Sequence, residues 1–374
     1  MSERKNILVT GATGFLGSHL TARMLQNGYH VTALARGSKT ASPKARVEDA
    51  LRDVGVLQLE NLEVVEGDIS SPGLQLKEAD KKKILATTDE VWHCAASLSF
   101  EEEDREEIFR MNVDGTCNML DLLRQTRTRR LHHVSTAYIA GNRTDLALET
   151  EINVGQTFKN AYEESKCRAE LLIADEQQKG TIEASVYRPS IVIGDSKSGR
   201  ATHFHGVYAF MRALWAALEK LRRRRPVSGP VHLPLRVLGV ETQTLNFVPI
   251  DYVVNGMVSI ARRLDSMGRT YHLANPTPTE NRIWFWHICR LLGVDGIQLV
   301  GQNSFLKTPC TKLEALFQKK MAFYYQYLQG EPRFDCRRAL EALENTGIVC
   351  PPVTVEFINH MVGWYVDFLN AKAT

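Results

Sequence analysis

The first 35 residues change their hydrophobic period twice. A short apolar run at Ile7–Val9 leads through a glycine-containing turn into apolar positions at helical spacing, which continue to Gln26. Gly28 ends this pattern, and a second apolar run follows at His30–Ala35. A strand, a helix and a strand in this order predict a βαβ unit with two parallel strands.

The same alternation continues to about residue 195. Strand-like runs end at Asp68–Ile69, at Cys94–Ala96 and at Ser135–Thr136, and helical patterns separate them, including an amphipathic stretch over 161–172. Alternating strands and helices predict an α/β fold, here a Rossmann-type doubly wound parallel sheet.

The pattern changes after Ser190. A long amphipathic helix is predicted over 204–221, short strands with Pro and Gly breaks over 226–253, and mostly helices over 281–374. We therefore expect residues 1–195, with about 240–260, to form the Rossmann domain. The remainder of 196–374 is expected to form a smaller, helix-rich substrate-binding region.

Composition narrows the class of protein. The chain has 374 residues, 44% of them hydrophobic and 24% charged, and its net charge of +3 is too small to indicate nucleic-acid binding. Seven scattered cysteines without a CxxC pair predict free thiols and no metal site. We see no signal peptide and no apolar run of roughly 20 residues, so the sequence predicts a cytoplasmic protein without a membrane span.

The turn after the first strand reads Gly11-x-x-Gly14-x-x-Gly17. Glycines at this point allow a tight turn and a close approach of backbone to a pyrophosphate, and the N-terminus of the following helix supplies free N–H groups. We expect the cofactor to be bound by the turn residues Gly11, Thr13, Gly14, Phe15, Leu16 and Gly17.

The end of the second strand indicates which dinucleotide is bound. An acidic residue at this place suits the ribose 2′-hydroxyl of NAD, whereas arginine suits a 2′-phosphate. Here Arg36 comes first, with Lys44 and Arg46 as helpers, and no acid appears before Glu48. The sequence predicts NADPH, although a merely solvated basic loop would look the same.

The stretch 161–172 carries a tyrosine and a lysine four residues apart, so Tyr162 and Lys166 lie on one face of the predicted helix. An ammonium held near a phenol favours the phenolate and lowers the pKa of the phenol. Alone, the pair could equally be an ordinary surface pair. His93 and Cys94 could suggest a nucleophile pair, but a packed strand end explains them better.

Several segments, in order, resemble the extended short-chain dehydrogenases/reductases: TGATGFLG, GDI, HCAA, VSTAYIAG, Tyr162-x-x-x-Lys166 and YRPSIVIGDS. VSTAY, RPSIVIGDSKSG and NFVPIDYVVNGM are most similar to the branch of fatty acyl-CoA reductases and thioester reductases, which includes the terminal reductase domains of carboxylic acid reductases and peptide synthetases. The resemblance covers about residues 5–275. The SGR-x-x-x-FDG pattern of this branch appears as SGRATHFHG, with His205 in place of the acid.

The resemblance implies a role for each matching residue. Tyr162 would be the proton donor, Lys166 would bind the nicotinamide ribose and tune Tyr162, and Thr136, with Ser135 as the fallback, would bind the substrate carbonyl. Asn112 matches a helix asparagine near the site, although bracing of its own helix is an equally good reading. The remaining matches lie along the cofactor: Asp68, Ile69, Ala95, Ala96, Pro189 and Ser190.

Together these features predict an NADPH-dependent reductase that converts an acyl thioester, bound to coenzyme A or an acyl carrier protein, to an aldehyde and on to an alcohol if a second hydride follows. The basic run at Arg222–Arg225 would then dock the carrier or the phosphates of coenzyme A, or would simply be a solvated helix end. The alternatives are a reductase of a small ketone or aldehyde, a nucleotide-sugar epimerase or dehydratase, and a non-catalytic NADPH-binding regulator.

Overall fold

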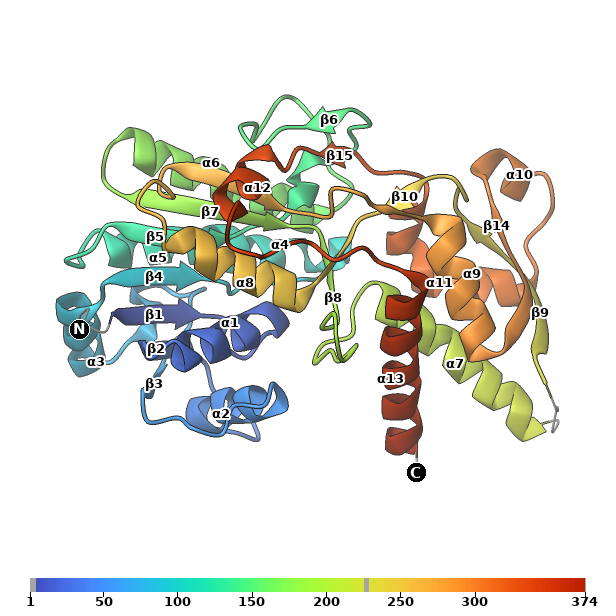
Figure 1. The fold of residues 1–374 in the computed structure, drawn as a ribbon, viewed down its shortest axis with the longest axis horizontal. Coiled ribbons are helices and arrows are strands. Elements are labelled where there is room, and N and C mark those ends of the chain that lie inside the picture. The colour runs from blue at the N-terminus through green and yellow to red at the C-terminus, as the bar shows by residue number, and fades with distance from the viewer. Residues whose placement is uncertain (1–4, 225–228, 374) are drawn as a thin grey trace. The chain divides into compact units, whose positions relative to one another are not determined.

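A computed structural model describes residues 5–224 and 229–373, and Figure 1 shows their fold. The chain divides into two compact units, each made of three separate segments. Unit 1 comprises residues 1–190, 250–274 and 334–349, and unit 2 comprises 191–249, 275–333 and 350–374. The chain therefore leaves unit 1 three times and returns to it twice.

Unit 1 is built on a seven-stranded sheet in which all strands are parallel, in the order β12-β7-β5-β4-β1-β2-β3. Its strands are largely buried, as expected for a parallel sheet covered on both faces. They are β1 (Asn6–Thr10), β2 (His30–Ala35), β3 (Leu62–Glu66), β4 (Glu90–His93), β5 (Arg130–Val134), β7 (Glu183–Pro189) and β12 (Arg269–Leu273).

Helices pack in two groups beside this sheet. In one group α1 contacts α2 and α8, and α8 contacts α12; in the other α6 contacts α4 and α5. The helices and short elements of unit 1 are α1 (Phe15–Gln26), α2 (Pro43–Asp53), η1 (Pro72–Gln75), α3 (Glu78–Thr87), η2 (Glu102–Asp104), α4 (Arg105–Phe109), η3 (Arg110–Asp114), α5 (Gly115–Leu123), η4 (Ala137–Ala140), β6 (Leu146–Ala147), α6 (Ala161–Gln178), α8 (Ile250–Ala261) and α12 (Arg337–Leu343).

The strand order places a switch point between β1 and β4. From β1 the chain proceeds outward to β2 and β3, and then returns to β4 on the other side of β1. In open parallel sheets, ligands bind beyond the carboxyl ends of the strands at such a point. The residues that follow β1, β4 and β5 are therefore the first place to look for a site.

Unit 2 contains three small two-stranded sheets and five helices among the described residues. The strand pairs are β9 with β14, β8 with β11, and β10 with β13. Its elements are β8 (Ile191–Ile193), α7 (Val207–Arg224), β9 (Val231–Leu238), β10 (Thr244–Leu245), β11 (Phe247–Pro249), β13 (Thr279–Glu280), α9 (Asn281–Leu292), β14 (Val294–Val300), α10 (Gln302–Leu306), α11 (Lys312–Leu328) and α13 (Val355–Ala373). In the chain, β15 (Arg333–Phe334) spans the boundary between the units.

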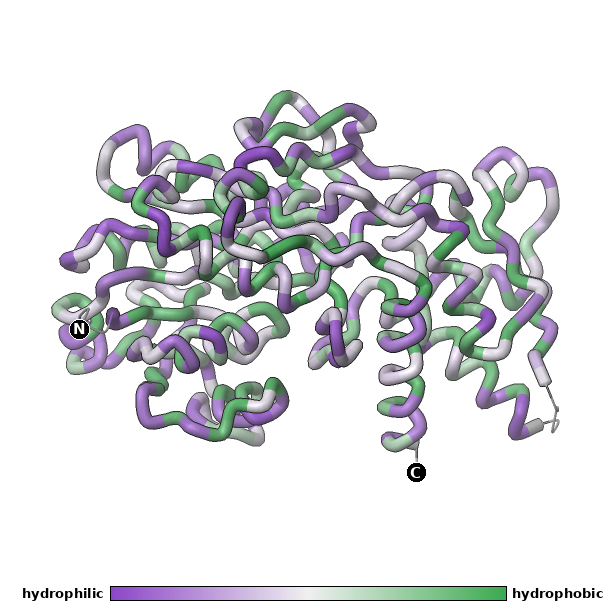
Figure 2. Tube along the Cα trace, viewed as in Figure 1, coloured by the Kyte–Doolittle hydropathy of each residue, from purple (hydrophilic) through white to green (hydrophobic). Residues whose placement is uncertain are grey.

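Hydropathy follows these elements. In Figure 2, α13 alternates along its length between green apolar residues and purple or white ones. Its buried residues, such as Ile358, Val362 and Tyr365, recur at helical spacing. Within the described residues, no helix combines the length and the apolar character that crossing a bilayer requires.

The fold agrees with the predicted α/β class, while the unit boundaries differ from the expected domains. The sequence assigns about 240–260 to the Rossmann domain, whereas unit 1 takes 250–274 and also 334–349. The reason is long-range pairing, because β12 pairs with β7 as the edge strand of the sheet, and α12 packs on β12 and α8. The strand β14 also lies in the region expected to be mostly helical.

Two buried polar networks fasten the returning segments within unit 1. The carboxylate of Glu149 accepts hydrogen bonds from the backbone N–H groups of His272, Arg338 and Ala339 at 2.9, 2.7 and 3.1 Å. The guanidinium of Arg188 forms a fully buried ion pair with Glu170 at 2.6 Å, and its Nη1 lies 3.2 Å from Nε2 of His272 on β12. Both networks supply partners to charges that would be costly to bury alone.

Candidate active site

The glycine turn between β1 and α1 is sterically obligatory. Gly11 has a φ of +78°, and a Cβ there would lie 2.6 Å from the backbone nitrogen of Ala95. A Cβ at Gly17 would lie 2.0 Å from the Gly11 carbonyl oxygen. The turn therefore brings the backbone after β1 against the backbone after β4, which side chains at either glycine would prevent.

The N-terminus of α1 is open to a ligand. Its N-cap residue is Gly14, no side chain caps the first turn, and that turn contains no acidic residue. Thr13, Phe15 and Leu16 are partly exposed around it. Free N–H groups together with the positive end of the helix dipole form a binding site for the phosphates of a dinucleotide.

The end of β2 presents the arginine that the sequence singled out. Arg36 is exposed, and its Nη1 lies 3.7 Å from Asp68 Oδ2 and 4.0 Å from the sulfur of Met111. Arg46 donates to the carbonyl of Arg36, so both predicted arginines lie together. Lys44 instead pairs with Glu48 at 3.8 Å.

Asp68 and Ile69 follow β3. The Oδ1 atom of Asp68 accepts hydrogen bonds from the backbone and hydroxyl of Ser70. Burial raises the pKa of Asp68, but the bonds from Ser70 and the charge of Arg36 outweigh it, so its pKa is lowered overall. The carbonyl of the buried Ile69 accepts from Asn118 at 2.8 Å, which holds this loop in place.

Thr136 and Tyr162 meet at the carboxyl end of β5. Thr136 is buried and caps η4 by accepting from the backbone of Tyr138 at 3.2 Å. It is also hydrogen-bonded to Tyr162, which lies in the first turn of α6. Ser135, the fallback residue, has a buried hydroxyl without a partner among the described residues. The contact with Tyr162 favours Thr136 over Ser135.

Lys166 lies one turn further along α6 and is 2% exposed. Its ammonium donates to the Val134 carbonyl at 2.7 Å and faces His133 Nε2 at 3.3 Å. Burial lowers the pKa of Lys166 to about 8, while the charge of Glu170 opposes this effect. A lysine with such a pKa is charged at neutral pH and loses its proton in mildly alkaline solution.

The pKa of Tyr162 contradicts the prediction from the sequence. Burial raises this pKa above its ordinary value, and the hydrogen bond with Thr136 does not offset the rise. The physical reason is that a phenolate taken out of water loses more solvation than one hydroxyl returns. Tyr162 is therefore protonated at neutral pH, which is the state that a proton donor needs.

The other predicted residues line the strand ends of unit 1. Ala95 and Ala96 are partly exposed after β4, and the Ala95 N–H donates to Thr10 Oγ1 at 3.2 Å. Pro189 ends β7, and its carbonyl lies 3.5 Å from the Thr136 hydroxyl. Ser190 is buried directly after it. The carboxyl ends of neighbouring strands thus present most of the predicted set at one edge of the sheet.

A family comparison matches this arrangement. The family model described as "Male sterility protein", a model of NAD-binding domains, matches residues 9–257, which is more than half of the chain. The chain belongs to the male sterility protein family. A nicotinamide dinucleotide is accordingly the ligand that the glycine turn and the open α1 terminus fit.

Relatives within and near this family include fatty acyl-CoA reductase 1 of Mus musculus, which is 29% identical over 301 residues. That alignment covers 69% of this chain and 55% of the mouse protein. The chain spans about half or less of the length of the curated relatives that match first.

Two solved structures show the same fold. The terminal R domain from the myxalamid PKS-NRPS biosynthetic pathway aligns with a TM-score of 0.80 and 24% identity, over 98% of this chain and 92% of that one. A thiolation-reductase di-domain from an archaeal non-ribosomal peptide synthetase aligns with a TM-score of 0.75 and 20% identity, over 98% and 76%. This family member therefore shares the fold of these two structures.

Asn112 forms buried hydrogen bonds with two neighbouring segments of unit 1. It is 1% exposed within the π-helical turn η3, and its Oδ1 accepts from the Ser97 N–H at 2.7 Å. Its Nδ2 donates to the Ser97 carbonyl and, at 2.9 Å, to Ser165 Oγ. Asn112 therefore ties the loop after β4 to the helix that carries Tyr162. A π-turn often marks a functional site.

Cys94 does not act as a nucleophile paired with His93. His93 Nδ1 is hydrogen-bonded to Thr10 at 2.8 Å, and burial raises the pKa of the Cys94 thiol to about 12. A buried, protonated thiol is unreactive. Among the described residues, no group of three or more His, Cys, Asp or Glu side chains is placed to hold a metal ion.

Sequence reasoning missed the buried polar residues around Lys166, namely Thr10, Thr116, His133 and Ser165. All four are at most intermediate in exposure and sit on β1, α5, β5 and α6. The available signal was the polar pair His132-His133 within the strand RLHHV, three residues ahead of Thr136.

Proposed function

We propose that this protein is an NADPH-dependent reductase of acyl thioesters that produces an aldehyde. The observation that carries the proposal is the placement of Thr136, Tyr162 and Lys166 at the carboxyl end of β5, in a chain of this family. The fatty acyl-CoA reductases and terminal reductase domains among its relatives support a thioester as the substrate.

Thr136, Tyr162 and Lys166 have separate roles in the proposed reaction. The hydroxyls of Thr136 and Tyr162 donate to the substrate carbonyl oxygen, on which negative charge develops. When bound, the cofactor supplies a hydride to the carbonyl carbon. Tyr162 transfers its proton to that oxygen, and the ammonium of Lys166 stabilises the phenolate left behind.

A thioester reduced in this way becomes a hemithioacetal. Its C–S bond breaks, the thiol leaves with a proton, and an aldehyde remains. One NADPH and one proton are consumed for each aldehyde and thiol released. Reduction of the aldehyde to an alcohol would need a second NADPH at the same residues.

Arg36 and Arg46 support NADPH as the cofactor. Their cationic groups lie at the end of β2, where a 2′-phosphate on the adenine ribose would be held. Although Arg36 lies near Asp68, more than half of its side chain remains exposed and can contact a phosphate. An arginine fork matches the geometry of a phosphate group.

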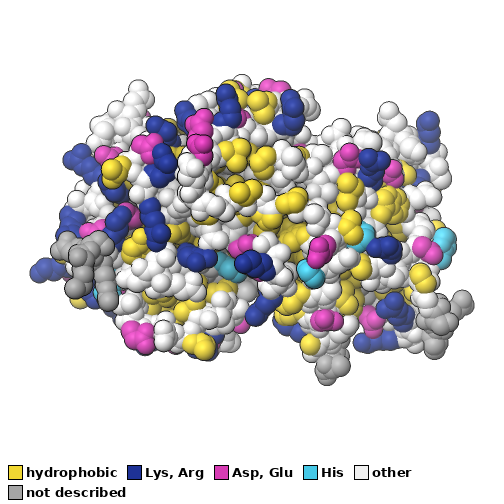
Figure 3. Space-filling model, viewed as in Figure 1, with side chains coloured by type: hydrophobic (Ala, Val, Ile, Leu, Met, Phe, Trp, Pro, Cys, Tyr) yellow, Lys and Arg dark blue, Asp and Glu magenta, His cyan; other side chains and the backbone are white. Residues whose placement is uncertain are grey.

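We further propose that an acyl carrier protein docks at the end of α7. Lys220 and Arg223 are exposed there, whereas Arg222 lies 3.6 Å from Glu219. Of the predicted run, Arg225 and the side chain of Arg224 lie outside the described part of the structure. In Figure 3, basic and acidic side chains are interspersed on the face shown. The run of cations at the end of α7 differs from this mixed pattern. The thiolation-reductase di-domain, in which a reductase adjoins a thiolation domain, supports this partner.

The first experiment mixes purified protein and NADPH with acyl-CoAs, acyl-carrier thioesters, free aldehydes, ketones or a nucleotide sugar. NADPH consumption is followed by absorbance, free thiol by a chromogenic reagent and products by mass spectrometry. Thioester-dependent consumption with release of thiol and aldehyde is expected. Consumption with aldehydes or ketones alone would instead make the protein a carbonyl reductase, and turnover of a nucleotide sugar without net NADPH consumption would make it an epimerase.

Docking is tested by charge reversal. Arg223→Glu combined with Arg224→Glu should lower kcat/KM about tenfold for carrier-bound substrate and leave a free aldehyde unaffected. Lys82→Glu, an exposed reversal on α3, is the matched control. An unchanged kcat/KM for the carrier-bound substrate, or an equal relative loss with both substrates, would contradict the docking site. A cytoplasmic location stays a prediction from the cysteine pattern.

A further inference from the structure

Two buried histidines lie beneath the ammonium of Lys166. His133 on β5 is 0% exposed and His93 on β4 is 1% exposed, and their ring centroids are 5.3 Å apart. Neither ring is needed to fill a strand interior, because an apolar side chain would do so without polar atoms to satisfy. Their hydrogen bonds therefore indicate what each one does.

Every polar atom of His93 has a structural partner. The Thr10 hydroxyl accepts from the Ala95 N–H at 3.2 Å, so its hydrogen is available for His93 Nδ1 at 2.8 Å. The Thr116 hydroxyl donates to the Asn112 carbonyl at 2.7 Å and so accepts from His93 Nε2 at 3.4 Å. This assignment makes His93 neutral and fully engaged in bracing β1, β4 and α5.

His133 differs, because its only described polar contact is with Lys166. An ammonium has no lone pair, so Nε2 of His133 must accept the bond and Nδ1 must carry the proton. Nδ1 is buried and has no partner among the described residues. Unpaired buried N–H groups are rare in folded proteins and call for an explanation. Phenylalanine would fill the position without this penalty.

We propose that His133 is a positioning residue for Lys166. Its Nε2 and the Val134 carbonyl together fix the direction of the Lys166 ammonium at the end of β5 and favour its charged form. The inference rests on the proposed function, in which Lys166 stabilises the phenolate of Tyr162.

The groups that face Lys166 come from three elements and the loop after β4. They are His93 on β4, Cys94 after it, His133 on β5 and Glu170 on α6, and Tyr162 lies one helical turn before Lys166 on α6. Among them Glu170 favours the ammonium by its charge, but it is already engaged by Arg188. A neutral acceptor on His133 also favours the ammonium, so its removal moves the titration of Lys166 to lower pH.

Three substitutions distinguish loss of the hydrogen-bond acceptor at His133 from a change in side-chain volume. His133→Phe keeps the ring volume and removes the acceptor. His133→Gln can place its amide oxygen near the position of Nε2, whereas His133→Asn is too short to do so. Thermal unfolding of each variant checks the fold, and His133→Phe is expected to unfold within a few degrees of the unsubstituted protein.

Two readouts are measured. Carbon-13 NMR of labelled lysine, with the Lys166 signal identified by its loss in Lys166→Met, gives the titration of Lys166 without any substrate. His133→Phe and His133→Asn should lower its midpoint by about one pH unit, and His133→Gln should restore most of this shift. The fall of kcat/KM in alkaline solution should move to lower pH by the same amount. The kcat/KM of His133→Phe should therefore be about fivefold below that of the unsubstituted protein at pH 8 and less than twofold below it at pH 6.

A purely structural role predicts another result. In that case all three variants would lose activity equally at every pH, or His133→Gln would resemble His133→Phe, and either outcome would overturn the proposal. An unchanged NMR midpoint in His133→Phe would do the same. If no thioester is reduced by the unsubstituted protein, the proposed function fails, whereas the NMR titration still decides the role of His133.

Discussion

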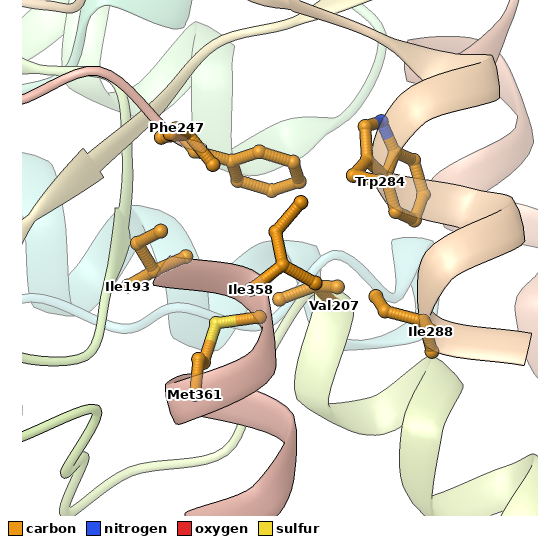
Figure 4. A pocket seen from close by; sticks show the side chains of 8 residues that line it. Ile193, Val207, Phe247, Trp284, Ile288, Ile358 and Met361 are labelled. Carbon is orange, nitrogen blue, oxygen red and sulfur yellow. The ribbon is translucent and has the colours of Figure 1, made fainter. Parts of the chain in front are cut away.

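The interiors of the two units are built from different chemistry. Around Lys166, unit 1 buries polar side chains in two sets of hydrogen bonds. One set joins Lys166 to His133, and the other joins Thr10, His93, Thr116, Asn112 and Ser165. Unit 2 contains a pocket between β8, β11, α7, α9 and α13 whose described lining is wholly apolar, as Figure 4 shows. Beside α13, the rings of Phe204, Tyr208 and Tyr365 pack with centroids 4.9–5.7 Å apart.

The difference teaches what each interior can control. Hydrogen bonds fix the direction of single atoms, at the cost of taking polar groups out of water. Apolar packing fixes volume and shape, and it tolerates substitution when the volume is kept. Unit 1 is thus suited to hold donors in fixed directions, and unit 2 is suited to form an apolar surface.

The largest expected effect removes one hydroxyl from unit 1. Tyr162→Phe should lower kcat by about 10²–10⁴-fold without loss of folding, because the proton donor is gone while the ring packing remains. Steady-state NADPH oxidation measures the effect, and Tyr29→Phe is the control. Undiminished activity in Tyr162→Phe would show that another group donates the proton.

Next in size is the buried ion pair of unit 1. Arg188→Met leaves the Glu170 carboxylate buried without its partner and should lower the free energy of unfolding by about 3–5 kcal/mol. Urea titration measures this loss. The double variant Glu170→Leu with Arg188→Met should be less costly than Arg188→Met alone. If the double variant instead had a lower free energy of unfolding than Arg188→Met, the ion pair itself would be strongly stabilising.

In unit 2, the loss of stability on truncating a side chain should depend only on the volume removed. Ile358 is 1% exposed and lines the apolar pocket, so Ile358→Ala should cost about 2–5 kcal/mol of stability. Val355→Ala on the same helix, at a residue 45% exposed, should cost far less. At temperatures below its unfolding transition, Ile358→Ala should bind NADPH with unchanged affinity. A large change in affinity would show that the apolar pocket of unit 2 also affects cofactor binding in unit 1.

The smallest effect concerns the choice of cofactor. Arg36→Ala should reduce the preference for NADPH over NADH by about 10–100-fold, because one phosphate contact is lost. Arg52→Ala, at an arginine of similar exposure on α2 that pairs with Asp49, is the matched control. Ratios of kcat/KM for the two cofactors measure the preference, and an equal loss with both would assign Arg36 a structural role.

Local patterns predicted much of unit 1. The strand expected at Ile7–Val9 is β1, the helix expected to end at Gln26 is α1, and the tyrosine and lysine lie four residues apart on α6. These features depend on neighbours in sequence, which periodicity and glycine spacing report directly.

Long-range features were beyond the sequence pattern. The pairing of β12 with β7 joins residues more than 80 positions apart, and the donors to Glu149 come from residues 272 and 338–339. The contact between His133 and Lys166 is equally invisible, because strand periodicity says that a residue faces inward without saying which atom it meets. The raised pKa of Tyr162 likewise depends on burial by the whole unit.

The discontinuity of unit 1 has a consequence for synthesis of the protein. While a ribosome is still adding residues 191–249, β12 and α12 do not yet exist, so the sheet lacks its edge strand and Glu149 lacks every one of its three donors. Unit 1 can close only after Val349 has emerged, by which time most of unit 2 has also been made. The nascent chain must therefore hold α6, which carries Tyr162 and Lys166, in an unfinished domain while residues 179–349 are added.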